Sequence, residues 1–336
     1  MKKILVTGGC GFIASFLIKK LLKNKNNFIL NLDALKKQSV PESLNEIKKN
    51  KNYKFLKVDI TNYKKTNKII SQFKPNLIFH LAAESHVDRS IVNPSAFIFS
   101  NINATLSILE SLRNNNFWKK DANFKLINVS TDEVYGSLSK KQKSFTENNK
   151  FLPNSPYSSS KASSDLIVRS YFKTFNIPII TTNCSNNYGP WQFPEKLIPV
   201  VIASCLNKKA IPIYGNGKNI RDWLYVGDHI NALIKISKIN DYGSSYNIGG
   251  GVELTNIQIV RRICKMMDDL IPNKKKYSSL IKFVKDRKSH DFRYSVNIDK
   301  IQKKINYKPS YSFDEGLMET VSWYVSNSKW LNKKIN

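Results

Sequence analysis

The sequence has few of the residues that build disulfide scaffolds and metal centres. Its 336 residues include only four cysteines and four histidines, which are scattered and form no C-x-x-C pair. This excludes a disulfide framework and a zinc site, favours a reducing compartment, and leads us to predict no metal ligands. With 41% hydrophobic and 24% charged residues, the composition also excludes a disordered tail and a collagen-like fibre.

Long apolar runs are also absent from the sequence. No stretch approaches the roughly 20 residues of a membrane span. The N-terminus resembles a secretory signal, but Gly8, Gly9 and Gly11 interrupt its apolar run and no small-residue cleavage site follows. We therefore predict a cytoplasmic protein without a membrane partner.

Acidic residues are scarce relative to basic ones. The chain has 25 Asp and Glu against 54 Lys and Arg, which gives a formal net charge of +29. Such an excess is typical of proteins that bind nucleic acid or anionic membranes. Here it is spread along the chain in short lysine runs, without a basic block that carries interleaved aromatic residues. Compositional drift explains it better, because lysine, asparagine and isoleucine, all abundant here, share A/T-rich codons. We predict no nucleic-acid partner.

Apolar segments of strand and helix length alternate along the first half of the chain. Strands are expected at 4–7, 28–33, 55–59, 77–81, 125–129 and 177–182, and helices at 12–22, 63–73, 95–113 and 157–175. This alternation predicts an α/β fold, a doubly wound parallel sheet of the Rossmann type. Beyond Gly189-Pro190 the pattern is less regular. We expect one domain over 1–189 and a smaller, mixed α/β domain over 190–336, with some exchange of strands between them.

A glycine-rich turn follows the first expected strand. Gly8-x-x-Gly11-x-x-Ala14 lets the backbone approach a pyrophosphate, which would rest on the amides that open the next helix. Asp33 ends the second strand, where its carboxylate can accept hydrogen bonds from a ribose. A 2′-phosphate would meet that negative charge, so NAD is favoured over NADP. Lys36 and Lys37 lie close enough in sequence to weaken this preference.

Tyr157 and Lys161 stand four residues apart at the start of an expected helix, and so lie on one face. Lowering a phenol pKa from about 10 by three units takes about 4 kcal/mol, which a cation about 4 Å away supplies at a surface-like dielectric. The pair therefore predicts a phenolate base. An ordinary exposed Tyr–Lys pair is the alternative, disfavoured by the dinucleotide turn and by Thr131 at a strand end.

Thr131-Asp132-Glu133 follows the fifth expected strand. Oxidation of an alcohol needs only a hydroxyl donor and a base, which Thr131 and Tyr157 provide. Two further carboxylates indicate an additional acid–base step, in which one is protonated and the other ionised. Alternatively, Asp132 caps a turn and Glu133 is solvated.

These motifs resemble the extended short-chain dehydrogenase/reductases and, among them, the dTDP-glucose 4,6-dehydratase family. The resemblance runs from Lys3 to about Trp330. Its matching stretches are TGGCGFIAS, HLAAESHVDRSI, NVSTDEVYG, SPYSSSKASSD, TNCSNNYGPWQFPEKLIP, PIYGNGKNIRDWLYVGDH, YNIGG and DRKSHDFRY.

The resemblance implies a three-step reaction on dTDP-glucose. Tyr157, assisted by Lys161 and Thr131, removes the C4 hydroxyl proton while hydride passes to bound NAD. Glu133 then takes the C5 proton and Asp132 protonates the departing C6 hydroxyl. Hydride returns to C6, giving dTDP-4-keto-6-deoxyglucose, water and regenerated NAD.

The resemblance also implies binding residues, divided between an NAD-binding first domain and a second domain that mainly binds the nucleotide sugar. The NAD set is Gly8, Gly11, Phe12, Ile13, Asp33, Asp59, Ile60, Leu81, Ala82, Ala83, Ser100, Tyr157, Lys161 and Asn187. The nucleotide-sugar set is Ser85, Thr131, Asn186, Lys196, Leu197, Pro212, Tyr214, Arg221, Asn256 and His290. A homodimer through the helices at 95–113 and 157–175 is implied as well.

Alternatives remain for single residues and for the whole chain. Arg221 could pair with Asp222, and His290 could be a satisfied loop histidine. The sequence departs from the family pattern at Cys10, Ala14 and Gly227, at Lys288-Ser289 where Pro-Gly is usual, and in a shorter loop after Gly136. Alternative functions are a UDP-glucose 4,6-dehydratase, a nucleotide-sugar epimerase, and a catalytically silent NAD- or nucleic-acid-binding protein.

Overall fold

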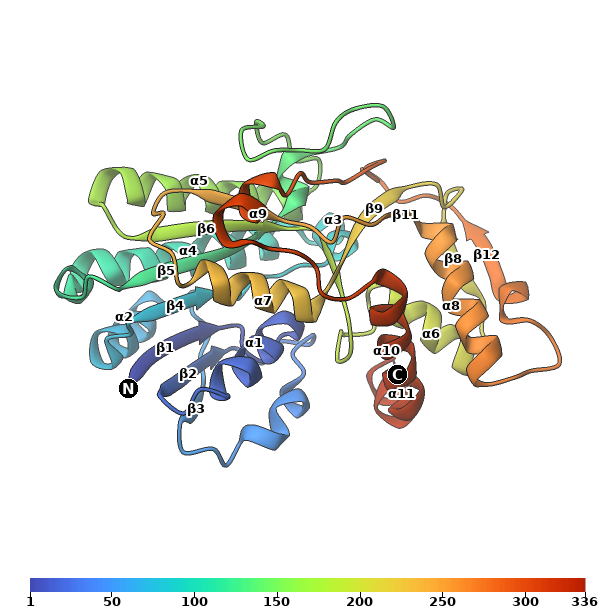
Figure 1. Cartoon of the computed structure of the whole chain (residues 1–336), viewed down its shortest axis with the longest axis horizontal. Coiled ribbons are helices and arrows are strands. Elements are labelled where there is room, and N and C mark those ends of the chain that lie inside the picture. The colour runs from blue at the N-terminus through green and yellow to red at the C-terminus, as the bar shows by residue number, and fades with distance from the viewer. Residues whose placement is uncertain (336) are drawn as a thin grey trace.

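A seven-stranded sheet forms the centre of the molecule (Figure 1). The structure is a computed structural model, and it describes residues 1–335. Every neighbouring pair of strands is parallel, in the order β10-β6-β5-β4-β1-β2-β3. The direction of winding reverses between β1 and β4, where ligands bind in such sheets. This confirms the predicted doubly wound fold. The strands are β1 (Lys2–Thr7), β2 (Asn27–Asp33), β3 (Tyr53–Lys57), β4 (Leu77–His80), β5 (Lys125–Thr131), β6 (Ile179–Cys184) and β10 (Ser245–Ile248).

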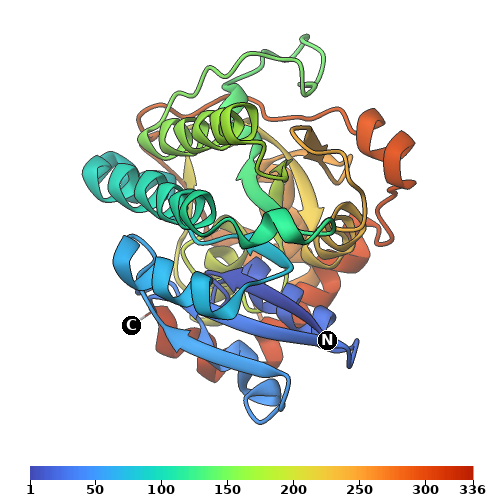
Figure 2. The same ribbon diagram turned by 90° about the vertical axis from the view of Figure 1, so that its left-hand side faces the viewer.

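Helices cover both faces of this sheet. On one face α2 (Tyr63–Phe73), α4 (Pro94–Asn115) and α5 (Pro156–Phe175) lie side by side, as Figure 2 shows. On the other face α1 (Phe12–Leu22) packs against α7 (Val226–Ile236). Strand β1 shows why both layers are needed. Ile4 and Val6 point into the core on one side and Leu5 into the core on the other, and all three are buried.

The remaining elements form a second region, on the right of Figure 1. A three-stranded sheet has the order β11-β9-β7, and β8 pairs with β12. The chain also returns to the first region after residue 190, because β10 joins the large sheet and α7 covers it. The elements of this region are β7 (Asn186–Tyr188), β8 (Ile211–Tyr214), β9 (Ile220–Tyr225), β11 (Glu253–Thr255), β12 (Ile281–Val284), α6 (Leu197–Leu206), α8 (Asn256–Leu270), α10 (Phe313–Ser326) and α11 (Ser328–Ile335). Helix α9 (Asp299–Ile305) packs against β10 of the large sheet. Asn336, the end of the predicted second domain, lies outside the described residues.

Several predicted boundaries need correction. The third strand begins at Tyr53, where it pairs with Ile29, and ends at Lys57 rather than at 59. The sixth begins at Ile179 because Pro178 has no N–H to donate, and only its carbonyl joins the sheet by accepting from Leu126. Strand β5 continues to Thr131, so the predicted catalytic threonine is the last residue of a buried strand.

Shorter elements complete the fold. A short helix, α3 (Val87–Val92), packs against α4 and α5. Short 3-10 helices lie at Pro41–Ile47, Phe117–Lys120, Asp132–Tyr135 and Tyr277–Leu280. Among residues 1–335, no helix is both long and apolar enough to cross a lipid bilayer.

Candidate active site

A cavity of about 460 Å³ lies between the carboxyl ends of the central strands and the second region. It brings together most of the site residues that the sequence predicts, from segments far apart in the chain. These are Gly8, Gly11, Phe12, Ile13, Leu81, Ala83, Ser85, Thr131, Asp132, Glu133, Tyr157, Lys161, Asn186, Asn187, Lys196, Leu197, Pro212, Tyr214, Arg221, Asn256 and His290. Asp33, Asp59, Ile60, Ala82 and Ser100 are not among the lining residues.

The glycine-rich turn is shaped by close backbone approach. Gly8 has a φ of 70°, and a Cβ at this position would stand 2.7 Å from the Cα of Ala82. The backbone of Ala82 therefore packs directly against the turn and leaves no room for a side chain at Gly8. Helix α1 begins after Gly11 without a side-chain cap, so the amides of Phe12 and Ile13 at its N-terminus are free to bind an anion at the cavity wall. This arrangement fits the pyrophosphate of NAD.

Asp33 ends β2 beside this turn. Its carboxylate accepts the backbone N–H of Cys10 at 2.9 Å, the backbone N–H of Leu35 at 2.7 Å and the hydroxyl of Ser39 at 3.0 Å. These bonds orient a charged acceptor at the strand end, which fits a ribose. Lys36 is engaged elsewhere, because its Nζ donates to Ser100 Oγ at 3.0 Å.

Asp59 and Ile60, also predicted to bind NAD, stand in the turn after β3. The Asp59 carboxylate accepts the backbone N–H of Thr61 at 3.0 Å and its hydroxyl at 2.8 Å. Ile60 is buried against the α2–α4 side of the sheet. In the described structure both residues shape the turn.

Tyr157 and Lys161 lie on the first turns of α5, which Ser155 opens through a reciprocal capping box with Ser158. Tyr157 is only 8% exposed and packs edge-on against Phe97. Burial raises the pKa of the Tyr157 phenol well above its usual value, the charge of Glu133 raises it further, and the Thr131 hydroxyl opposes this.

Lys161 lines the cavity and is buried, with 4% of its surface exposed. Its Nζ donates to the carbonyl of Val129 on β5 at 3.0 Å. Burial lowers the pKa of Lys161, and the charge of Asp165 on the same helix raises it. That Lys161 lowers the phenol pKa remains a prediction from the sequence.

Asp132 and Glu133 differ in environment although they are neighbours. Thr131, not Asp132, caps the turn, because its Oγ accepts the Glu133 N–H at 3.3 Å. Asp132 is 1% exposed, and burial followed by the Glu133 charge raises its pKa well above the usual value. Burial also raises the pKa of Glu133, but the nearby cations Lys196, Arg287 and Arg221 oppose that rise. Asp132 is thus the member of the pair that is shifted more strongly toward its protonated form.

Three cations from the second region surround Glu133. Lys196 donates to the Ser85 carbonyl at 2.7 Å, and Arg287 pairs with Asp88 at 3.1 Å. Arg221 is 6% exposed, lies 4.4 Å from the Tyr294 ring centroid, and donates to backbone carbonyls at 2.7 and 3.0 Å. Together they form a positive wall suited to a diphosphate.

The alternative interpretations of Arg221 and His290 have different outcomes. Within the described chain Arg221 makes no ion pair with Asp222, whose carboxylate accepts the N–H of Val252 instead. His290 lines the cavity, and its Nδ1 contacts Asp286 Oδ1 at 2.6 Å. One of its two ring nitrogens therefore has a hydrogen-bond partner within the loop, as the alternative of a satisfied loop histidine predicts. Ser289 has a φ of 50°, the left-handed conformation that glycine favours.

Two predicted residues of the second region are held by neighbours in the first region. Asn187 contacts Nδ1 of the buried His229 at 2.8 Å. Tyr214 donates from its hydroxyl to Asp88 at 3.2 Å. Asn186 begins β7, Leu197 begins α6, Asn256 begins α8 and Pro212 lies in β8.

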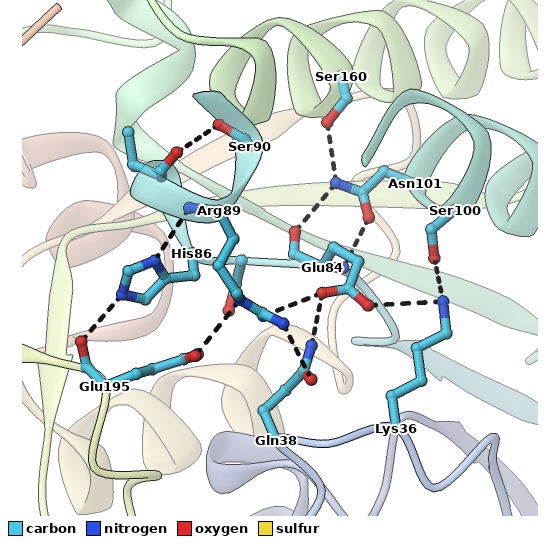
Figure 3. A network of polar contacts seen from close by, with 12 residues as sticks. Lys36, Gln38, Glu84, His86, Arg89, Ser90, Ser100, Asn101, Ser160 and Glu195 are labelled. Atoms are coloured by element: carbon cyan, nitrogen blue, oxygen red, sulfur yellow. Dashed lines mark hydrogen bonds and ion pairs between the residues drawn. The ribbon is translucent and has the colours of Figure 1, made fainter. Parts of the chain in front are cut away.

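A polar network centred on Glu84 connects the two sides of the cavity (Figure 3). The Glu84 carboxylate accepts from Gln38 at 2.5 Å and from Arg89 at 3.0 Å, and Lys36 stands 3.5 Å away. Arg89 also reaches Glu195, the residue before Lys196, at 3.4 Å. The network therefore ties the segment after β2 to the loop before α6.

Asn101 connects this network to α5, the helix that carries Tyr157 and Lys161. Its Oδ1 accepts the Glu84 N–H at 2.8 Å, and its Nδ2 donates to Ser160 Oγ at 2.8 Å (Figure 3). Ser160 precedes Lys161 and donates to the Tyr157 carbonyl at 2.7 Å. The buried bonds fix α5 relative to the loop after β4.

Sequence reasoning missed several residues of the cavity. His86, Gln192, Trp223 and Arg287 line it. Arg287 was within reach, because it belongs to the DRKSHDFRY stretch that also contains His290. For Gln192 and Trp223 no local pattern distinguishes a lining side chain from a core one.

Comparisons with known proteins agree with this geometry. A family model described as GDP-mannose 4,6 dehydratase matches residues 5–320. The dTDP-glucose 4,6-dehydratase 1 of Escherichia coli (strain K12) is 45% identical over 98% of this chain and 94% of its own length. That of Neisseria meningitidis is 44% identical over 100% of this chain and 97% of its own.

Solved structures with the same overall fold include a dehydratase and an epimerase. A dTDP-glucose 4,6-dehydratase from Streptomyces venezuelae, solved with NAD bound, superposes with a TM-score of 0.91 at 36% identity and covers 99% of both chains. The UDP-glucose 4-epimerase of Thermotoga maritima has a TM-score of 0.84 at 26% identity, covering 97% of this chain and 99% of its own. Because the family model spans most of the chain and the relatives match nearly all of it, the chain belongs to the dTDP-glucose 4,6-dehydratase family.

Proposed function

We propose that this protein converts dTDP-glucose into dTDP-4-keto-6-deoxyglucose and water, with NAD as a bound catalyst. The observation that carries the proposal is the pair Asp132 and Glu133, which share the cavity with Tyr157 but have differently perturbed pKa values. Relatives named for this activity, and a structure solved with NAD bound, support it.

Oxidation at C4 needs a base for the hydroxyl proton. Tyr157 lines the cavity, and the Thr131 hydroxyl next to it stabilises the phenolate. When bound, NAD supplies the two-electron oxidation of the sugar and its reversal. The Gly8–Gly11 turn and the amides of Phe12 and Ile13 would hold its pyrophosphate, and Asp33 its ribose.

Loss of water from C5 and C6 needs a base and an acid. The C4 ketone makes the C5 proton acidic, and Glu133, kept ionisable by its three cations, takes that proton. Asp132, kept protonated by burial, donates its proton to the C6 oxygen, which leaves as water. One proton is taken and one is given, so the elimination is balanced. When C6 is reduced, Glu133 returns a proton to C5, which gives the saturated 4-keto-6-deoxy product.

Two alternatives make different use of the same cavity. A 4-epimerase is favoured by the Thermotoga maritima structure, but inversion at C4 needs neither a base for C5 nor an acid for C6. A UDP-glucose 4,6-dehydratase would use every catalytic residue identically and differ only in the base it binds. Incubation of the purified protein with dTDP-glucose and UDP-glucose, without added NAD, separates them. We expect the 4-keto-6-deoxy product from dTDP-glucose; a 4-epimer, or faster conversion of UDP-glucose, would contradict the proposal.

We further propose a cytoplasmic homodimer built on α4 and α5, with residues 1–189 binding NAD and residues 190–336 mainly binding the nucleotide sugar. Exposed apolar side chains on these two helices, Ile98, Phe99 and Leu166, support the dimer. Light scattering should give twice the chain mass. Replacing Phe99 with Glu should give the monomer mass, and an unchanged mass would contradict this interface.

A further inference from the structure

Asp165 is a buried carboxylate that the proposed mechanism leaves without a role. It lies on α5 four residues after Lys161 and is only 5% exposed. Residues four apart on a helix share a face, with Cβ atoms about 5–6 Å apart. A carboxylate this deep in the protein requires compensation, since burial of an uncompensated charge is strongly unfavourable.

Two amide groups from the sheet hold the Asp165 carboxylate. Asn128 on β5 donates to Oδ1 at 2.9 Å, and Asn183 on β6 donates to Oδ2 at 3.3 Å. An ionised carboxylate only accepts hydrogen bonds, whereas a protonated one must use one oxygen as a donor. Burial raises the pKa of Asp165, and the charge of Lys161 and the hydrogen bonds from the two amides oppose that rise. Because both oxygens accept from amide N–H groups, the contacts around this carboxylate favour its charged form.

The other titratable groups that face Lys161 do not balance its charge. His80 on β4 is neutral, because burial lowers its pKa to about 3. Cys184 on β6 is a neutral thiol, because burial raises its pKa to about 12. Burial raises the pKa of Asp132, which follows β5, well above its usual value, and so favours its neutral form. Asp165 is therefore the carboxylate whose charge raises the pKa of Lys161. It acts across the helix face, since among the described residues the two side chains form no ion pair within 4 Å and the Lys161 Nζ donates to the Val129 carbonyl.

We propose that Asp165 is a positioning residue that keeps Lys161 protonated in the closed site, so that the ammonium is present when Tyr157 becomes a phenolate. This inference rests on the proposed function for its catalytic consequence. A lysine buried without a counter-ion gives up its proton readily, and a neutral amine cannot stabilise a phenolate. The carboxylate does not touch the sugar or the cofactor; it acts through Lys161.

The first experiment measures the pH dependence of C4 oxidation in single turnovers of the NAD-bound enzyme with dTDP-glucose, followed by the absorbance of the reduced nicotinamide. In Asp165→Asn the pKa of Lys161 falls, so the ammonium is lost at lower pH. We expect the alkaline limb of the rate profile to move down by about one to two pH units. A uniform loss of rate with an unmoved limb would overturn the proposal.

Two variants serve as controls for the pH profile. Asp165→Glu keeps the charge, and we expect it to restore the alkaline limb toward that of the wild type. Asp314→Asn removes an exposed carboxylate that pairs with Arg262 on the far side of the second region, and should leave the limb in place. If Asp314→Asn moved the limb equally, the effect would be one of net charge, which also contradicts the proposal.

A second experiment needs no catalysis and stays informative if Asp165→Asn folds poorly. Lys161→Met leaves Asp165 as a buried charge without a partner, so Asp165→Asn should raise the melting temperature in that background. In the wild-type background the same substitution should lower it. Equal destabilisation in both backgrounds would overturn the pairing. If dTDP-glucose is not the substrate, this cycle still gives its answer, so the two failures are distinguishable.

Discussion

The two sides of the cavity are built in different ways. On the sheet side, Thr131 ends a buried strand and Tyr157 opens a long helix, and both are more than nine-tenths buried. On the side of the second region, Lys196 and Arg287 come from segments between regular elements and are held by contacts across the cavity to Ser85 and Asp88. Groups that must be placed within a fraction of an ångström therefore stand on rigid elements, whereas two of the three cations suited to a diphosphate stand on loops. The third, Arg221, is buried on strand β9.

The largest effect is expected on the sheet side, from Tyr157→Phe. This variant keeps the ring that packs on Phe97 but removes the proton acceptor. Single-turnover oxidation at C4 should fall about 100- to 10,000-fold, the usual contribution of general base catalysis. The melting temperature and the amount of co-purified NAD should stay close to wild type. An equally large loss of NAD would indicate a binding role instead.

A smaller effect, of a different kind, is expected on the loop side from Lys196→Met. Removing one charge-assisted contact should raise KM for dTDP-glucose about 10- to 100-fold. Lys196 also opposes the rise in the Glu133 pKa, so its loss should move the acidic limb of kcat to higher pH. Lys209→Met, at an exposed position after α6, is the matched control. A drop in kcat at every pH without a change in KM would contradict the division between the two sides.

The pH dependence of the melting temperature should reveal how much the burial of Asp132 destabilises the folded protein. Because burial raises the pKa of Asp132 in the folded chain above its unfolded value, stability falls as pH rises through the unfolded value toward the folded one, and stays low above it. Asp132→Asn should therefore melt at a higher temperature than wild type at neutral pH, with the difference vanishing near pH ~4. The exposed Asp269→Asn is the control. A constant difference at all pH values would contradict the raised pKa.

The smallest effect is expected at Ser289, in the loop that carries His290. Its φ of 50° is unfavourable for a residue with a Cβ. Ser289→Gly should stabilise the protein by up to about 1 kcal/mol, less the entropy that glycine loses on folding. Thermal denaturation of this variant beside Ser279→Gly, in the 3-10 helix Tyr277–Leu280 and without a left-handed φ, measures the gain. Destabilisation by both would show that the Ser289 side chain has a role of its own.

The sequence predicts the sheet side much better than the loop side. Helices α1 and α2 have the predicted limits, because amphipathic periods and terminal residues are local signals. The turn at Gly8 and the pair Tyr157 and Lys161 are likewise defined by spacing along the chain. Arg221 shows what the sequence does not predict, because its stacking on Tyr294 depends on a loop about 70 residues further along the chain. Asp165 shows another, because nothing in its spacing from Lys161 indicates the two asparagines that donate hydrogen bonds to its carboxylate.

The central claim is that Glu133 removes a proton from C5 after the sugar has been oxidised at C4. The most direct test is conversion of dTDP-glucose in deuterated water by wild type and Glu133→Gln, with deuterium at C5 measured by mass spectrometry and NMR. We predict deuterium at C5 of the wild-type product, and in the variant detectable oxidation at C4 without loss of water. A wild-type product without deuterium at C5, or a variant that still loses water at the normal rate, would contradict the account.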